Sequence, residues 1–162
     1  MPLDHFRIDD RLVHGQVVVG WGQPLALGFI VLVDDVLAAS DWECELCRAG
    51  TPPGMDLFVE TVESAVARLP EFQSRADAGM LLTGNAGTMG ALCAAVPAIR
   101  AVTIGGLHHG PGRSPRLSYV FLSDADIAGL AEMTARGVRI VAQDLPGTRA
   151  VPLDELLRGH GT

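Results

Sequence analysis

Residues 28–35 read GFIVLVDD, and this stretch decides the fold. Five consecutive apolar residues end in a pair of aspartates. A continuous apolar run of this length is typical of a strand that is buried on both faces, as the strands of a parallel sheet are. Because parallel strands are joined by crossover connections that are usually helices, the stretch predicts an α/β domain.

The flanking sequence alternates between short β-rich runs and longer helical runs, as an α/β domain requires. Gly50, followed by two prolines, is the expected end of one helix, and Thr61 is the expected N-cap of the next. Besides 28–35, strands are predicted at residues 5–9, 56–61, 78–84, 101–107, 117–123 and 138–144, and helices at 14–25, 36–50, 62–69, 88–96, 124–137 and 152–159.

These elements predict one domain over residues 1–162, an α/β fold with an open, mainly parallel sheet of about seven strands and helices on both faces. The segment 108–116, HHGPGRSPR, is too short and too rich in glycine and proline for a helical crossover. The strands on either side of it are therefore candidates for an antiparallel pair near one edge of the sheet.

Composition excludes several classes of function. The net charge of −7 disfavours nucleic acid as a partner, since phosphate neutralisation requires a basic surface. The chain contains no lysine, which excludes a Walker-type phosphate loop and Schiff-base chemistry. No apolar run is long enough to span a membrane, and no signal peptide is visible. The three cysteines, an odd number in a chain without a secretion signal, indicate reduced thiols in the cytoplasm.

In open α/β sheets, ligands bind beyond the carboxyl ends of the strands, which directs attention to the loops 9–15, 84–88 and 105–116. His14 in the first loop offers an imidazole that titrates near neutral pH. We expect it at the N-terminus of a helix, where the backbone amides of Gly15, Gln16 and Val17 would point at a group on its ring. The alternative is a purely structural role, in which the histidine only caps the helix.

Two neighbours of His14 extend this interpretation. Arg11 could offer a bidentate fork to phosphate oxygens. Asp10 could orient Arg11, or bond an imidazole nitrogen and fix its tautomer. Together, these residue types suit a histidine that carries a phosphoryl group.

Three further motifs compete for a functional role. GNAGTMG, residues 84–90, has the wrong glycine spacing for a dinucleotide fingerprint and is interpreted as a tight strand-to-helix turn. The CxxC of Cys44 and Cys47 lies inside a predicted helix, so both thiols are expected to pack as small apolar residues, and no metal site is predicted. The loop with His108, His109 and Arg113 is a candidate for a positive lip over an anionic ligand, with a solvated loop as the alternative.

Taken together, five stretches closely resemble the IIB components of the mannose/fructose/sorbose family of bacterial phosphoenolpyruvate-dependent sugar phosphotransferase systems. The first, RIDDRLVHGQVVVGW at residues 7–21, satisfies the family run R-[IV]-D-x-R-L-[IV]-H-G-Q-V without a gap. The others are IVLVDD (30–35), AGTPPGMDL (49–57), TIGGLHHGPGR (103–113) and GVRIVAQDLP (137–146). The chain departs from the family where a lysine and an aromatic residue often follow the paired glycines, because Leu107, His108 and His109 stand there instead.

The resemblance implies a protein-Nπ-phosphohistidine–sugar phosphotransferase without cofactor or metal. His14 would accept a phosphoryl group from a phosphohistidine of a IIA protein and pass it to a sugar bound by the membrane components IIC and IID. Arg11 would contact the phosphoryl group or the partner, and Asp10 matches the acid of the loop. The protein would be cytoplasmic and associated with the inner face of the membrane through IIC and IID. A regulatory phosphoprotein of the same fold, and an anion-binding module in which His14 is only a cap, are the alternatives.

Overall fold

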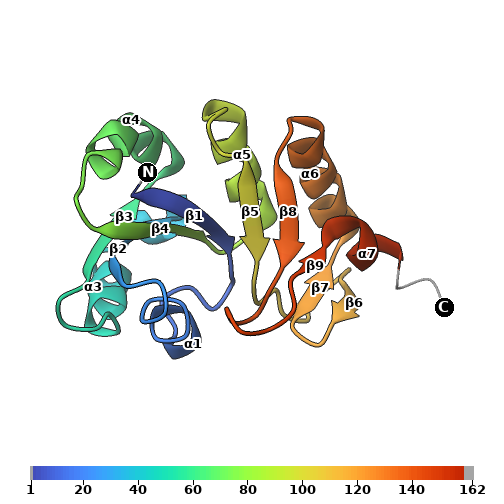
Figure 1. Ribbon diagram of the computed structural model, residues 1–162, viewed down its shortest axis with the longest axis horizontal. Coiled ribbons are helices and arrows are strands. Elements are labelled where there is room, and N and C mark those ends of the chain that lie inside the picture. The colour runs from blue at the N-terminus through green and yellow to red at the C-terminus, as the bar shows by residue number, and fades with distance from the viewer. Residues whose placement is uncertain (1, 159–162) are drawn as a thin grey trace.

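The computed structural model describes residues 2–158, apart from the side chains of residues 15 and 16, and its strands and helices alternate along the chain (Figure 1). The strands are β1 (Leu3–Ile8), β2 (Leu27–Val33), β3 (Asp56–Glu60), β4 (Ala78–Thr83), β5 (Ala101–Ile104), β6 (Ser114–Leu117), β7 (Val120–Leu122), β8 (Arg139–Ala142) and β9 (Val151–Pro152). The helices are α1 (Gly15–Val18), α2 (Asp35–Ala38), α3 (Asp41–Ala49), α4 (Val62–Gln73), α5 (Ala86–Ala95), α6 (Asp124–Ala135) and α7 (Leu153–Arg158).

Seven strands form one sheet in the order β3-β2-β4-β1-β5-β8-β9. All neighbouring pairs in it are parallel except β8 and β9, which run antiparallel at one edge. The predicted fold class is therefore confirmed: an open, mainly parallel sheet with one antiparallel edge strand.

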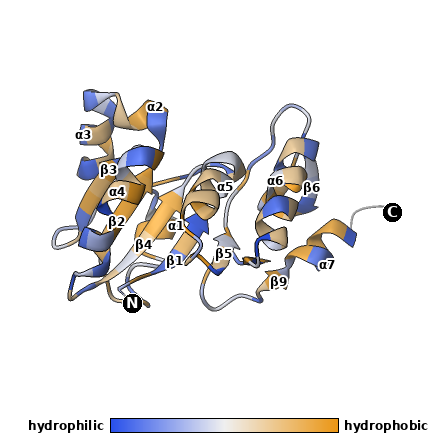
Figure 2. Ribbon diagram, turned by 90° about the horizontal axis from the view of Figure 1, so that it is seen from above, coloured by the Kyte–Doolittle hydropathy of each residue, from blue (hydrophilic) through white to orange (hydrophobic). Residues whose placement is uncertain are grey.

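The two faces of β2 show why its sequence is apolar throughout. Phe29 and Val31 belong to a core cluster shared with α4, α5 and α6, whereas Ile30 and Leu32 belong to a second cluster shared with α1. Residues that alternate along a strand point to opposite faces of the sheet, so a strand covered on both sides must be apolar at every position. Figure 2 shows hydrophobic colours concentrated on the strands at the centre of the sheet.

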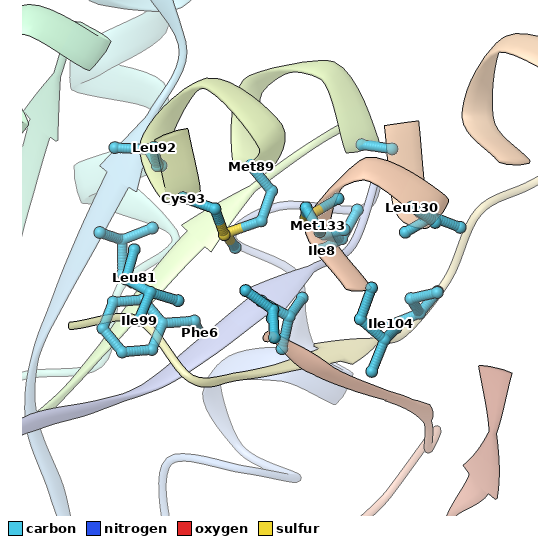
Figure 3. Packing of buried hydrophobic residues seen from close by; sticks show 14 of the residues in the cluster. Phe6, Ile8, Leu81, Met89, Leu92, Cys93, Ile99, Ile104, Leu130 and Met133 are labelled. Atoms are coloured by element: carbon cyan, nitrogen blue, oxygen red, sulfur yellow. The ribbon is translucent and has the colours of Figure 1, made fainter. Parts of the chain in front are cut away.

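The larger core lies between the sheet and α5 and α6 (Figure 3). Met89 and Leu92 of α5 and Leu130 and Met133 of α6 are each at most 1% exposed. They pack above Ile8 of β1, which puts the central strand under the helix layer. Among the described helices, none has the length and hydropathy required to cross a membrane.

The strand predicted at residues 117–123 is confirmed only where β7 lies, because Leu117 ends β6 and the two strands form a hairpin in a separate two-stranded sheet. Leu107, which follows β5, forms a parallel bridge with Val120, so the pairing across residues 108–116 is parallel and not antiparallel as expected. The antiparallel edge strand is instead β9, a two-residue segment that the sequence pattern does not reveal.

The helix predicted at 36–50 is also divided. Asp34 caps α2 by accepting a hydrogen bond from the amide of Leu37, and Ser40 then adopts an extended backbone conformation before α3 begins. The expected ends are confirmed: Gly50 is the C-cap of α3, and Thr61 caps α4 in a capping box with Ser64.

Strand order places the loop after β1 at a switch point. The chain leaves β1 towards α1 on one face, whereas it leaves the neighbouring β4 towards α5 on the other face (Figure 1). Adjacent strands whose connections diverge in this way open a crevice beyond their carboxyl ends. The loop that carries His14 follows the carboxyl end of β1 at this switch point.

Candidate functional site

The loop after β1 is folded tightly against the strands beside it. The amide of Asp9 donates to the carbonyl of Thr83 (2.8 Å), and that of Asp10 donates to the carbonyl of Gly106 (2.7 Å). Leu12 has a φ of 53°, in the left-handed region that costs a non-glycine residue of order 1 kcal/mol. Its side chain packs against the core cluster on the α1 face, which offsets this strain. The loop is thereby held in one shape.

His14 lies at the end of this loop with an exposed side chain. Its carbonyl accepts hydrogen bonds from the amides of Val17 and Val18, both at 2.9 Å, which starts α1 as predicted. The prediction that the Val17 amide is available to a group on the imidazole is wrong, because this amide is used by the His14 carbonyl. Gly15 and Gln16 occupy the first turn of α1, where amides have no acceptor within the helix. Their role as donors stays a prediction, and α1 has only four residues to contribute a dipole.

Asp9, and not Asp10, is the acid that orients Arg11. Fully buried, its carboxylate accepts hydrogen bonds from Nε and Nη2 of Arg11 at 2.8 and 2.6 Å, and from Nη2 of Arg7 at 3.2 Å. Burial opposes ionisation of Asp9, but the hydrogen bonds and charges of the two arginines outweigh it and lower its pKa. Asp9 is therefore a carboxylate locked between two guanidinium groups.

Arg11 also contacts the carboxylate of Asp144, with Nη2 3.3 Å from Oδ1. The hydrogen bonds from Arg11 to Asp9 raise the pKa of Arg11, so its charge is fixed at any physiological pH. The edge of the guanidinium formed by Nε and Nη2 is turned towards Asp9. Arg11 was predicted to offer two N–H groups to phosphate oxygens. In the structure, the Nε and Nη2 groups on this edge donate to the carboxylate of Asp9 instead.

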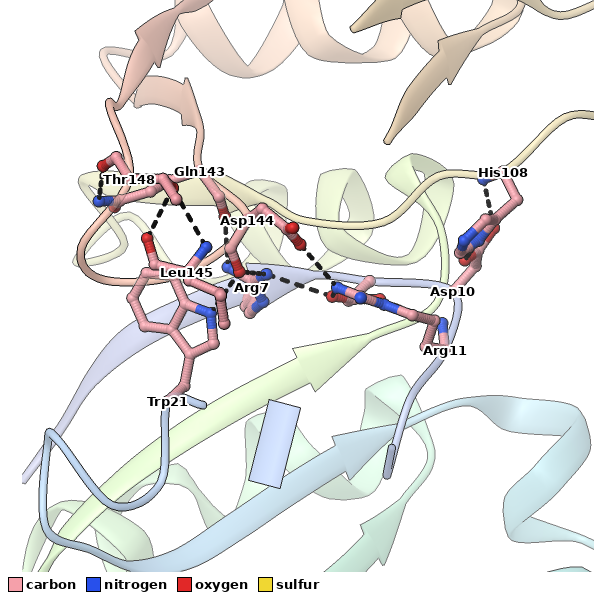
Figure 4. Close-up of polar contacts among 10 residues, drawn as sticks. Arg7, Asp10, Arg11, Trp21, His108, Gln143, Asp144, Leu145 and Thr148 are labelled. Carbon is pink, nitrogen blue, oxygen red and sulfur yellow. Dashed lines mark hydrogen bonds and ion pairs between the residues drawn. The ribbon is translucent and has the colours of Figure 1, made fainter. Parts of the chain in front are cut away.

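Asp10 bonds an imidazole, but that of His108. Its Oδ1 lies 2.5 Å from Nδ1 of His108, and its Oδ2 accepts from the backbone amide of His108 at 2.7 Å (Figure 4). Two roles were expected for Asp10. Asp9, and not Asp10, orients Arg11. Asp10 does bond an imidazole, but this is the ring of His108 in the loop after β5 and not that of His14. Asp10 therefore ties the His14 loop to the loop after β5.

Acidic side chains accompany the positive charge of the lip formed by residues 108–113. Arg113 donates from Nη1 to the carbonyl of His108 (3.0 Å), and its Nε lies 3.4 Å from a carboxylate oxygen of Asp126. His109 packs edge-on against Phe121, with ring centroids 5.8 Å apart. The two adjacent histidines thus face different neighbours. Because Asp10 and Asp126 both lie beside Arg113, the lip has no excess of fixed positive charge.

Arg116, which shares this loop, points elsewhere. Its Nη1 approaches the carbonyls of Leu156 and Leu157 in α7 at 3.5 and 3.3 Å. Arg116 therefore helps to hold the last helix and is directed away from the His14 loop.

Arg7, Asp9, Arg11, Trp21 and Asp144 contact one another, and we call them the charge cluster. Three of them were not predicted from the sequence: Arg7, Trp21 and Asp144. Arg7 is 1% exposed, stacks on the ring of Trp21 at 4.4 Å, and donates to the backbone carbonyl of Asp144 at 3.0 Å. The indole Nε1 of Trp21 donates to the same carbonyl at 2.8 Å. Burial lowers the pKa of Arg7, against the attraction of Asp9. One signal was available: Arg7 and Asp9 are two apart in a strand and so point to the same face.

The paired glycines after β5 let the backbone lie against this cluster. A Cβ at Gly105 would overlap the guanidinium of Arg7 and the carboxylate of Asp9. A Cβ at Gly106 would lie 2.9 Å from Nε of Arg11 and 3.0 Å from Oδ1 of Asp9. Both positions therefore require glycine, because side chains of the charge cluster fill the space that a Cβ would need.

The remaining motifs have the structural roles that the sequence indicated. Asn85 caps α5 by accepting from the amide of Thr88 at 2.8 Å, as a strand-to-helix turn requires. Cys44 is buried and Cys47 is partly buried in the core beneath α3. Within the part of the chain that the structure describes, no group of three or more His, Cys, Asp or Glu side chains is placed to hold a metal ion.

Comparison with known proteins gives consistent similarities. The family described as "PTS system sorbose subfamily IIB component" matches residues 3–162. The sorbose-specific EIIB component of Klebsiella pneumoniae is 31% identical over 148 residues, which cover 89% of this chain and 90% of that protein. The mannose-specific EIIAB component of Escherichia coli strain K12 is 28% identical over 83% of this chain, but only over 42% of its own length.

A solved structure agrees with the sequence comparison. The crystal structure of the IIBSor domain of the sorbose permease from Klebsiella pneumoniae superimposes with a TM-score of 0.89 at 27% identity, with all of both chains covered. The sheet described above and that domain therefore share one fold.

Proposed function

Because this chain belongs to the sorbose subfamily of phosphotransferase-system IIB components, we propose that it carries a phosphoryl group on His14 from a IIA phosphodonor to a sugar. Members of this family are phosphotransferases for sugars. The observation that carries the proposal is the placement of an exposed imidazole at the switch point of the sheet, on a loop that backbone hydrogen bonds tie to Thr83 and Gly106.

The first transfer requires only a nucleophile in line with the bond that breaks. A ring nitrogen of His14 attacks the phosphorus of a phosphohistidine on the donor. The new N–P bond forms as the donor's N–P bond breaks, and the electron pair returns to the donor imidazole. Exposure of His14 allows a protein donor to approach, which a buried histidine would prevent.

The second transfer reverses this geometry with a sugar hydroxyl as nucleophile. The O–P bond forms as the N–P bond of phosphorylated His14 breaks, and the hydroxyl proton replaces the phosphoryl group on the imidazole. No cofactor is required, since phosphoryl transfer depends mainly on positioning and charge stabilisation.

Arg11 is the residue that we expect to support the phosphoryl group. Asp9 holds its guanidinium with two hydrogen bonds, whereas the contact with Asp144 is longer, at 3.3 Å. A dianion on His14 would therefore compete with Asp144 for Arg11 more readily than with Asp9. His108, His109 and Arg113 are proposed as the lip beside the group, with Asp10 as the tie between lip and loop.

The relatives indicate which partners to test. The Escherichia coli relative is named as an EIIAB component, which supports a IIA protein as the donor. The specificities named for the relatives include sorbose, mannose, fructose and N-acetylgalactosamine, so we propose a sugar of this kind, received through membrane components IIC and IID. This role would place the protein at the cytoplasmic face of the membrane, in contact with those components.

A phosphotransfer assay tests the proposal. The protein is incubated with enzyme I, HPr, a IIA protein from the same genome and labelled phosphoenolpyruvate. We expect an acid-labile, base-stable label on the wild type and on His5→Ala, a partly exposed histidine of β1 outside the site, and no label on His14→Ala. A wild type that stays unlabelled beside a charged IIA protein, or a His14→Ala variant that labels normally, would refute the proposal.

A further inference from the structure

Helix α3 presents apolar side chains to solvent. Trp42 is 70% exposed and Leu46 is 63% exposed, and their i, i+4 spacing places them on one side of the helix. The opposite side, with Cys44 and Cys47, packs towards the core. Packing within the described chain therefore does not account for the apolar side chains of Trp42 and Leu46.

Acidic residues surround this pair. Glu43 and Glu45 flank Trp42 and Leu46 on α3, and we call these four residues the α3 patch. Over α2 and α3 the charged residues are Asp35, Asp41, Glu43, Glu45 and Arg48. Arg48 is paired with Glu45 at 3.4 Å, so the region keeps a negative excess. Figure 2 shows this mixture of hydrophilic and hydrophobic residues on α2 and α3 at one side of the molecule.

The C-terminal end of α3, the helix that carries the patch, adjoins the loop of the candidate site. A Cβ at Gly50, the C-cap of α3, would lie 3.7 Å from the carbonyl oxygen of Val13, the residue before His14. Leu12 and Val13 pack against the same apolar cluster as Cys47. A partner seated on α3 would thus stand beside the loop that carries His14.

The charge of the patch selects among partners. Anionic lipid head groups would be repelled by it, so a direct lipid contact is disfavoured. A protein segment rich in Lys and Arg is complementary to it, and cytoplasmic loops of membrane proteins carry such an excess. An exposed tryptophan is a typical anchor of a protein interface.

We propose that the α3 patch docks a basic cytoplasmic segment of the membrane component to which the phosphoryl group is delivered. Trp42 is the anchor, and Glu43 and Glu45 give the attraction and its salt dependence. The inference rests on the proposed carrier function, since that function requires a membrane acceptor next to His14.

The test measures binding and phosphorylation separately. The full chain is sedimented with inverted membrane vesicles that contain the IIC and IID proteins of the same genome, and with vesicles that lack them. The variants are Trp42→Ala and Glu45→Lys, with Glu132→Lys on the exposed face of α6 as the matched control. Labelling of His14 by IIA is followed in parallel, and circular dichroism verifies folding.

We expect both patch variants to bind the loaded vesicles about tenfold more weakly than the wild type and the control, as loss of an interface anchor predicts. Labelling by IIA should be unchanged, and added salt should weaken binding of the wild type. Equal binding by all four proteins would overturn the inference, as would binding that does not need IIC and IID.

Two further outcomes would also overturn it. Loss of IIA labelling in the patch variants would assign the patch to the donor, and loss of a dimer in sedimentation equilibrium would assign it to a second copy of the chain. Failure of the carrier function would show as a wild type without label, and the vesicle binding would still decide whether the patch docks the membrane component.

Discussion

Asp9 is the residue on which the charge cluster depends, because it is the buried acid shared by Arg7 and Arg11. Asp9→Asn keeps the shape but leaves a buried arginine without its counter-charge, which typically costs about 3–5 kcal/mol. We expect a loss of this size in the free energy of unfolding, measured with urea, and slower labelling of His14. The control Asp154→Asn removes a solvent-exposed pair, in which the side chains of Arg158 and Asp154 are 74% and 76% exposed, and should change stability little. A small loss for Asp9→Asn would contradict the assigned role.

The lowered pKa of Asp9 also predicts a pH dependence of stability. The unfolded carboxyl titrates near its ordinary value of about 3.9, above its pKa in the folded protein. Unfolded chains therefore bind the proton first as the pH falls, and the stabilisation, which is complete at neutral pH, is lost progressively below about pH 5. An NMR titration of the Asp9 side-chain carboxyl carbon should give a midpoint below about 3.9. A midpoint at or above that value would show that burial outweighs the arginines.

The sequence predicted which histidine to examine but not which acid lies near it. His14 follows from its place between a strand and a helix, a local pattern. Asp9 and Asp10 are adjacent and chemically identical, but Asp9 directly follows β1 and turns inward with Arg7, whereas Asp10 lies in the turn and faces His108. Asp144 is more than 130 residues from Arg11 along the chain, so no local pattern joins them.

Gly105 lies where the end of β5 meets the end of β1, whereas Gly129 lies in open space on α6. Alanine substitutions at these two glycines should therefore have opposite effects on stability. In Gly105→Ala the methyl group would displace Arg7 or Asp9, and overpacking of this kind costs about 1–3 kcal/mol. Gly129 lies inside α6, where a Cβ has no other atom within 4 Å. Gly129→Ala should therefore stabilise the protein by about 0.5–1 kcal/mol.

Urea unfolding of both variants measures the difference, and labelling of His14 should slow only in Gly105→Ala. Equal stability of the two variants would mean that the backbone of β5 can withdraw from the cluster at little cost.

Elements with strong local signals were predicted well, and short elements were not. The buried run of β2 and the capped helix α4 depend on residues within one segment. In contrast, β9 has two residues and exists because it pairs with β8, and the β6–β7 hairpin depends on pairing across a turn. Tertiary pairing of this kind leaves little trace in the hydrophobic pattern of a single segment.

At the scale of the whole molecule, the first and the last loops at the carboxyl end of the sheet are joined by Trp21. Its indole donates to the carbonyl of Asp144, while its ring supports Arg7, which donates to the same carbonyl. The loop that follows β8 is in turn closed on itself, since Thr148 donates from its amide to the carbonyl of Leu145. The position of Asp144 beside Arg11 therefore depends on a residue from the other end of the chain.

Trp21→Phe tests this dependence. The phenyl ring keeps most of the apolar contact but loses the N–H donor, and because Arg7 still donates to the Asp144 carbonyl, we expect a cost of only about 0.5–1.5 kcal/mol. Amide exchange at Thr148 should become up to about tenfold faster as the loop is released, whereas Ile140 within β8 should keep its protection. Labelling of His14 should slow by a few-fold, because Arg11 loses the fixed position of Asp144. If exchange at Thr148 is unchanged, the loop is held by its own hydrogen bonds, and Trp21 serves the core alone.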